Sequence, residues 1–193
     1  MLKALRYNLP VLSLALLIGC AHSGTKKVTI DKSESTPDWV SDPKISYEKA
    51  DKVFFIAKEE VRGDERLGGC YDLASLLNRE NLLRSIADEV KGAIDNAQTS
   101  ISENAENVLG KVRSGKWEGK IIGFRDVEKA FERYQLINSA DGSNVERISC
   151  ALLSEIKKSD YQETKRSVIN KIVSVDPKLK EAITNKQIQF FTE

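Results

Sequence analysis

The strongest pattern along the chain is a regular alternation of apolar and charged residues in its middle third. Apolar side chains recur there at steps of three and four with charged residues between them, which predicts a long amphipathic helix. The apolar positions are Leu73, Leu76, Leu77, Leu83, Ile86, Ala87, Val90, Ala93, Ile94 and Ala97. Such a stripe needs a sheet or a second helix to cover it. The segment that follows, 96–112, suits a helix or an extended chain, and we predict a helix.

Runs of β-forming apolar residues predict three strands. Residues 52–57 precede a charged segment with glycines, which predicts a strand and then a loop. Residues 119–134 open with a β-type run and predict a long strand, although their second half also fits a helical step. Apolar side chains on both alternating faces of 145–156 predict a strand buried on both sides. The turn-forming residues 138–144 predict that the last two strands form an antiparallel hairpin.

Two helix signals follow the last strand. Asp160 and Glu163 have the spacing of a capping box ahead of a helical apolar face. The members of this face are Tyr161, the stem of Lys165, Val168, Ile169, Ile172 and Val173. Asp176-Pro177 predicts a final short helix with the proline at its first position. The order of elements predicts an α+β fold, in which the long amphipathic helix and the C-terminal helices cover one face of a small antiparallel sheet.

The first 19 residues have the three parts of a secretory signal. The first eight carry two basic residues and no acid, and the next ten are apolar apart from one serine. This apolar run is about half of the roughly 20 residues that a membrane-spanning helix needs. Its end, Leu17-Ile18-Gly19-Cys20, resembles the bacterial lipobox. That resemblance implies a lipoprotein signal peptide over 1–19, cleavage between Gly19 and Cys20, and acylation of the Cys20 sulfur and amine.

A lipidated cysteine predicts where the rest of the chain is placed. Two or more acyl chains hold a protein stably on a membrane, whereas one chain holds it only marginally. Residues 20–41 are mostly polar, so we predict a lipidated N-terminus with a flexible tether, followed by a single domain over 42–193. Under enteric-type sorting, an aspartate in place of Ala21 would retain a lipoprotein in the inner membrane. We therefore predict the bacterial outer membrane, and whether the domain faces the periplasm or the cell surface stays open.

Net charge bears on nucleic-acid binding, and the cysteine content bears on whether the domain has a disulfide. Without residues 1–19 the chain has 28 basic and 29 acidic residues, so it has no basic surplus for binding nucleic acid. With Cys20 lipidated, Cys70 and Cys150 are the remaining thiols, in a compartment that permits disulfides. A disulfide between them and two separate buried thiols are both compatible with the sequence.

The sequence predicts no catalytic residue, no metal site and no cofactor. Its one histidine, His22, lies in the predicted tether, which argues against a Ser/His/Asp or Cys/His arrangement and against a zinc site. Residues 110–116 match the phosphate-binding pattern GxxxxGK. Trp117, however, stands where a serine or threonine would bind magnesium, so we predict no nucleotide site. Residues 31–42 fail as a calcium loop, and adjacent acids such as Glu59-Glu60 are typical of solvated surface.

The order of these features resembles a known family. A lipobox is followed by a tether that ends in Pro37-Asp38-Trp39-Val40, by the strand VFFIA, by a long helix and by the strands GKIIGFRDVEKAFERY and VERISCALLSEI. Over residues 37–157 this order is similar to the LPP-twenty type of bacterial outer-membrane lipoprotein, a group similar to flagellum-associated accessory lipoproteins. The resemblance implies a non-catalytic α+β domain that is displayed from the membrane and binds other envelope proteins.

Trp39 has two candidate roles. It pins the tether onto the domain, which we favour, or it faces a partner protein, since tryptophan is over-represented at binding hot spots. As a whole, the sequence predicts an envelope lipoprotein that acts as a structural or protein-interaction module and is held to the membrane by its acyl chains. A peptidoglycan-binding lipoprotein is the alternative. A histidine-free hydrolase acting through two carboxylates is a third hypothesis.

Overall fold

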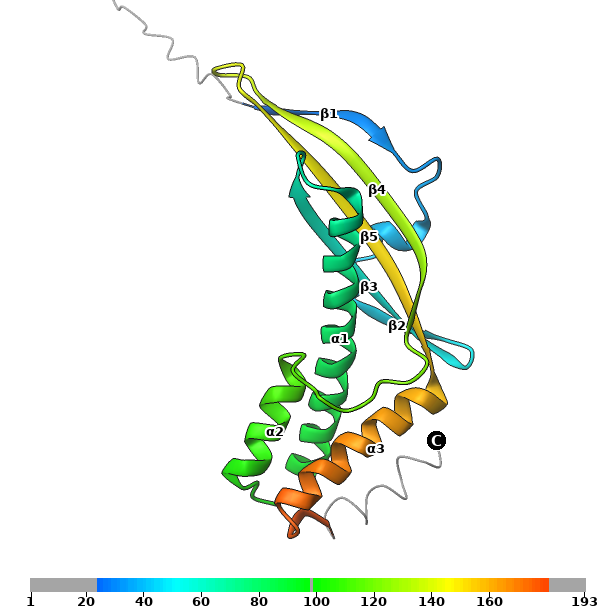
Figure 1. Ribbon diagram of the computed structural model, residues 1–193, viewed down its shortest axis with the longest axis vertical. Coiled ribbons are helices and arrows are strands. Elements are labelled where there is room, and N and C mark those ends of the chain that lie inside the picture. Colours follow the sequence, from blue (N-terminus) through cyan, green and yellow to red (C-terminus); the bar gives the residue numbers. More distant parts are fainter. Residues whose placement is uncertain (1–23, 98, 181–193) are drawn as a thin grey trace, which may run out of the picture.

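One five-stranded antiparallel sheet forms the centre of the molecule (Figure 1). The computed structural model describes residues 24–97 and 99–180. The strands lie in the order β1-β4-β5-β3-β2, and their bounds are β1 (Thr25–Lys32), β2 (Ser46–Lys49), β3 (Lys52–Arg62), β4 (Arg125–Asn138) and β5 (Asn144–Lys157). The helices are α1 (Leu67–Asn96), α2 (Glu103–Arg113) and α3 (Lys158–Val175), with one 3-10 turn, η1 (Asp38–Ser41). α1 packs on β3 and β5, which confirms the predicted α+β fold.

The long helix α1 covers one face of the sheet and continues past it to α2 and α3 (Figure 1). Alternate residues of a strand face the same side, and those of β5 that face α1 are almost fully buried. They are Ile148, Cys150, Leu152, Ser154 and Ile156. The first part of α1 packs with the middle of the sheet, whereas its later turns form a second apolar cluster with α2 and α3. The helix therefore joins the two halves of the core.

A connector, residues 33–45, covers the opposite face of the sheet. β1 and β2 are the two edge strands, so the chain between them has to cross the sheet. The Trp39 indole donates a hydrogen bond to Glu128, and the Lys58 ammonium donates one to the Asp42 carbonyl. Two β5 residues on this face are each 5% exposed, Ala151 and Leu153. β5 is therefore buried on both faces, as its sequence predicted.

The structure corrects the predicted tether, because residues 25–32 form β1 and pair with β4. Seven of the eight β1 side chains are exposed, so no apolar pattern marks this strand. Backbone pairing holds it, together with Lys27 and Thr29, whose side chains contact Glu132 at 2.5 and 2.7 Å. A bulge between Thr29 and Asp31 interrupts the pairing. The folded body therefore starts at Thr25 and not at residue 42.

Three other boundaries differ from the predictions. β3 continues to Arg62 through the predicted loop, because its charged second half pairs with β5 along its whole length. β4 begins at Arg125, six residues after the start of the predicted strand. α3 begins at Lys158 directly after β5, so Asp160 lies inside its first turn and no side chain caps the helix. The predicted capping box is therefore wrong.

The two helices predicted from the stripe 73–97 and from 96–112 are present as α1 and α2, although α2 begins only at Glu103. The apolar stripe of α1 is only partly covered. Leu73 and Leu76 are 48% and 54% exposed. They lie near the N-terminal end of α1, where α2 and α3 do not reach (Figure 1). After α3, the amides of Leu179 and Lys180 donate to the carbonyls of Asp176 and Pro177, which begins a helical turn at the predicted place. The remainder of that predicted helix lies outside the described residues.

Candidate functional site

The predicted lipidation site, Cys20, and the cleavage site after Gly19 lie outside the described residues. The first described residue, Gly24, sits at the tip of the β4–β5 hairpin, where its carbonyl accepts a hydrogen bond from the Ser139 amide at 3.2 Å. This tip and the helices α2 and α3 are at opposite ends of the molecule (Figure 1). The N-terminal segment therefore joins the folded body at the end remote from α2 and α3.

Cys70 and Cys150 form a disulfide that ties the first turn of α1 to the middle of the sheet. The Cα atoms are 6.1 Å apart, and both residues are at most 1% exposed. Apolar residues surround the bond, namely Ala57, Ala74, Ile148 and Leu152. Of the two arrangements that the sequence left open, the structure has the disulfide.

Trp39 lies in η1 with its ring half-buried on the sheet. Its Nε1 donates to Glu128 Oε2 at 2.7 Å, and a cavity of about 190 Å³ beside it is lined by Thr36, Val40 and Ala130, among others. Trp39 therefore holds the connector against the sheet. A contact between Trp39 and a partner protein stays a prediction.

Replacing Trp39 by alanine is expected to lower the free energy of unfolding by about 2 kcal/mol, because ring packing and a charge-assisted hydrogen bond are both lost. Trp39→Phe keeps most of the packing and removes only the donor, so it should cost about 1 kcal/mol. Urea unfolding gives both values, and amide hydrogen exchange reports whether the connector opens. An alanine variant as stable as the wild type would remove the pinning role and leave partner binding.

The α2–α3 groove is a cavity of about 580 Å³ between α2, α3 and the loop after α2. Six of its lining residues define it here: Lys111, Lys116, Trp117, Gly119, Asn170 and Lys171. The Trp117 ring packs on the core and is backed by Gly119, where a Cβ atom would lie 2.3 Å from the indole. A glycine is therefore required for this wall of the groove.

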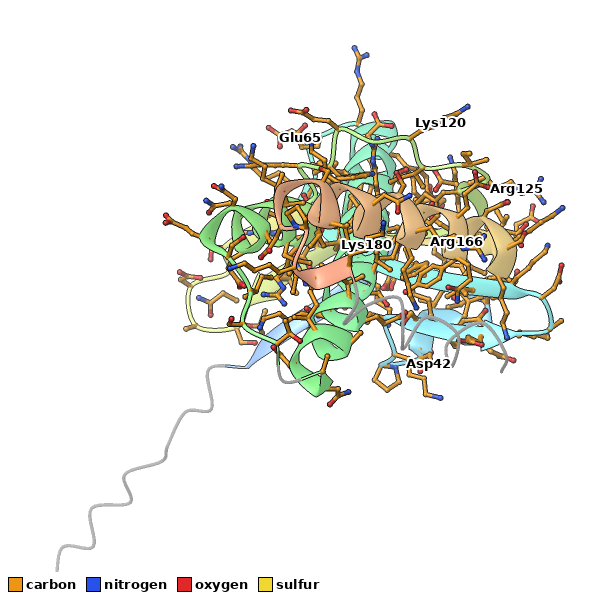
Figure 2. All side chains as sticks on the ribbon, turned by 90° about the horizontal axis from the view of Figure 1, so that it is seen from below. Asp42, Glu65, Lys120, Arg125, Arg166 and Lys180 are labelled. Carbon is orange, nitrogen blue, oxygen red and sulfur yellow. A yellow bond between two sulfur atoms is a disulfide. The ribbon has the colours of Figure 1, made fainter. Side chains whose placement is uncertain are left out.

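The groove combines an aromatic wall with amide and ammonium groups and one carboxylate, that of Glu118. In the described part of the chain, its three lysines form no ion pair, and the buried Nε1 of Trp117 has no hydrogen-bond partner. Figure 2 looks onto this end of the molecule, where Arg166 and Lys180 add further basic side chains. With three ammonium groups against one carboxylate, the groove suits a ligand that carries carboxylates on a polar framework.

The segment that matched the phosphate-binding pattern has a different geometry. Residues 110–113 are the last turn of α2, and Gly115 has a φ of +73° in the turn that follows. A phosphate-binding loop follows a strand and opens a helix. Here the segment ends a helix and leads into the loop 114–124, so its amides do not form a phosphate cradle.

Glu155 is a buried carboxylate held between two basic side chains of the neighbouring strands. Its side chain is 8% exposed, the Lys52 ammonium donates to both of its oxygens at 2.9 and 3.0 Å, and Arg125 donates at 2.7 Å. These hydrogen bonds, from Lys52 first and then Arg125, lower the pKa of Glu155 below its ordinary value. The arrangement ties β3, β5 and β4 together and keeps the carboxylate charged.

The lowered pKa of Glu155 predicts a contribution to acid stability. The contribution is present above the unfolded glutamate pKa of about 4.3 and is lost as the pH falls through the lower folded pKa. Glu155→Gln should therefore cost about 1 kcal/mol at neutral pH and make the unfolding free energy less dependent on pH between about 3 and 5. Exposed Glu65→Gln is the control. If the unfolding free energy of the Glu155 variant fell with acidification as steeply as that of the wild type, the prediction would be contradicted.

Other carboxylates take part in contacts within the fold. Glu59 and Glu60 are neighbours in β3, so their side chains point to opposite faces and do not form a pair. Glu89 accepts hydrogen bonds from the Tyr161 hydroxyl at 2.6 Å and from the Lys165 ammonium at 2.8 Å, which joins α1 to α3. Burial raises the pKa of Tyr161, and the charge of Glu89 adds to the effect, so the phenol stays protonated.

Within residues 24–97 and 99–180, no group of three or more His, Cys, Asp or Glu residues could hold a metal ion. None of the helices in the same part of the chain has the length and apolar content needed to cross a membrane.

Comparison of the chain with protein-family models, with curated proteins and with solved structures finds no match. The resemblance to LPP-twenty type lipoproteins therefore stays a prediction.

The residues of the α2–α3 groove were missed by sequence reasoning. In the sequence, Trp117 stands out only as the residue that breaks a phosphate-binding pattern. Asn170 and Lys171 lie more than fifty positions later, on α3. The packing of α3 beside α2 brings them to Trp117, and no local signal in the sequence indicates that packing.

Proposed function

We propose that this protein is a non-catalytic lipoprotein of the bacterial envelope, anchored to the outer membrane by acyl chains on Cys20. Its domain acts as a structural or protein-interaction module. The observation that carries the proposal is the lipobox at residues 17–20, which ends only five residues before the first strand, at Thr25. An acylated cysteine at that place attaches a folded body directly to a lipid surface.

Two features of the domain support the proposal. The buried Cys70–Cys150 disulfide suits an oxidising compartment such as the periplasm, because cytosolic thiols are kept reduced. Glu89, Glu128 and Glu155 are engaged in contacts that hold strands and helices together, which suits a binding domain better than a hydrolase. The α2–α3 groove is the surface that we assign to the partner.

The anchor is tested by mass spectrometry of the N-terminus and by membrane fractionation of the protein made in a bacterium. We expect the natural chain to begin at an acylated Cys20 and to sediment with the outer membrane. Cys20→Ser should release it to the soluble fraction, since the acylated sulfur is lost. In an enteric host, Ala21→Asp should keep the lipid and move the protein to the inner membrane. An intact N-terminus or an unmodified thiol would end the proposal.

A peptidoglycan-binding lipoprotein is the second candidate, and the chemistry of the α2–α3 groove favours it. Peptidoglycan presents carboxylates on a framework of sugars and amides, which matches ammonium groups beside an indole and an amide. Purified domain is mixed with isolated peptidoglycan and sedimented. Lys111→Gln/Lys171→Gln removes two groove charges, and Lys44→Gln/Lys49→Gln is the matched control on exposed lysines elsewhere. Co-sedimentation lost only in the groove variant supports this candidate, and absence of wild-type co-sedimentation favours a protein partner.

A further inference from the structure

We propose that the tip of the β4–β5 hairpin rests on the lipid headgroups and that the α2–α3 end of the molecule points away from the membrane. The tip is defined as residues 24–26 and 139–145. The inference rests on the proposed acylation of Cys20 and adds an orientation to it. The partner of this surface is a lipid bilayer.

The chain between the anchor and the folded body is short enough to keep the tip close to the membrane surface. Four residue steps separate Cys20 from Gly24. An extended chain spans at most about 3.6 Å per residue, so Gly24 lies within about 14 Å of the acylated residue. The polar layer of a bilayer is itself about 6 Å deep on each side. The Ser139 amide donates a hydrogen bond to the Gly24 carbonyl, and Thr25 pairs with Asn138. The whole hairpin tip is therefore held at the same height as Gly24.

The length of α1 shows that the α2–α3 end cannot be the end that rests on the membrane. α1 has 30 residues and is therefore about 45 Å long at 1.5 Å per residue. It runs along the long axis from the sheet toward α2 and α3 (Figure 1). The maximum tether length is about a third of that helix. A molecule turned over, with α2 and α3 on the lipid, would carry Gly24 beyond the reach of its anchor.

Surface chemistry favours the tip over the broad sides of the molecule. The tip carries two charged residues, Lys26 and Asp141, and is otherwise uncharged. The broad sides expose charges of both signs, on the connector Glu34, Asp38 and Lys44, and on α1 Arg79, Arg84 and Asp88. Pressing a broad side onto lipid would strip water from these charges, which costs free energy. An upright molecule leaves them hydrated and presents the α2–α3 groove to whatever lies beyond the membrane.

The orientation is measured with the full acylated protein in vesicles of phosphatidylethanolamine and phosphatidylglycerol, some of which carry a headgroup nitroxide quencher. A fluorophore is placed on a new cysteine at Ala140→Cys in the tip, or at Asn107→Cys on α2. Both positions are exposed. With Cys70 and Cys150 bonded and Cys20 acylated, the new thiol is the one that reacts. We expect most of the emission to be quenched at position 140 and little at position 107.

Two further measurements keep the outcome unambiguous. Flotation of each labelled protein with the vesicles establishes the anchor separately, so a protein that fails to float contradicts the proposed function. In a protein that floats, equal quenching at both positions or stronger quenching at 107 overturns the orientation alone. Inserting ten glycine and serine residues between Ser23 and Gly24 lengthens the tether and should weaken quenching at 140. Quenching at 140 that does not respond to the insertion would show that tether length does not set the height of the tip.

Discussion

Replacing both Cys70 and Cys150 by alanine is expected to lower the free energy of unfolding by about 4.5 kcal/mol. The two residues are 80 positions apart, so the bond removes much of the freedom of the unfolded chain. An entropy loss of this kind grows with the length of the closed loop. The bond also lies between α1 and the sheet, the two layers that give the fold its core.

Guanidinium unfolding of the wild type and of the double alanine variant measures this difference. Variants are preferable to a reductant, because both sulfurs are buried in the folded protein. The unfolded variant should also be more expanded, which raises the dependence of the unfolding free energy on denaturant. Equal midpoints and equal slopes for the two proteins would show that the crosslink contributes little.

Leu83→Ala is the second large effect that we expect, with a cost of about 3 kcal/mol. Leu83 is 0% exposed and packs in the cluster that α1 forms with α2 and α3. Truncating it removes apolar contacts and leaves a cavity in a part of the core that three helices enclose. Thermal or urea unfolding, followed by circular dichroism, gives the change.

Leu76→Ala is the matched control, because it makes the same chemical change on the same helix. Leu76 is 54% exposed, and its truncation should change the free energy of unfolding by no more than about 0.5 kcal/mol. The sequence assigned both leucines to one apolar stripe. If the two variants lost similar stability, the burial described for α1 would be wrong.

This pair of leucines shows how far the sequence alone could go. The three- and four-residue spacing predicted α1 correctly, since the periodicity depends only on which side of a helix is apolar. The sequence could not say where along α1 its neighbours end, because that depends on the placement of α2 and α3. β5 was predicted well for a related reason: a strand covered on both faces needs apolar side chains at successive positions.

β1 was not predicted because backbone pairing with β4 holds it, and this pairing does not require an apolar pattern in the strand. An exposed edge strand needs a partner with free backbone groups, and β4 supplies one from a hundred residues away. Tyr134, Glu132 and Arg133 of β4 lie opposite β1, so the pairing depends on long-range register. The groove has the same origin, since Trp117 and Lys171 meet only when α3 packs beside α2. In both cases the decisive contacts join segments that are far apart in the chain.

The two edges of the sheet are built so that neighbouring copies do not join. Under the proposed anchoring, copies held in one membrane by equally short tethers stand at the same height, so their open strand edges lie side by side at high local concentration. Four of the eight residues of β1 are charged, namely Lys26, Lys27, Asp31 and Lys32, and its bulge breaks the regular spacing that a foreign strand would need. At the other edge, β2 offers only four residues. In a layer of molecules anchored as proposed, these two edges would oppose aggregation through the sheets.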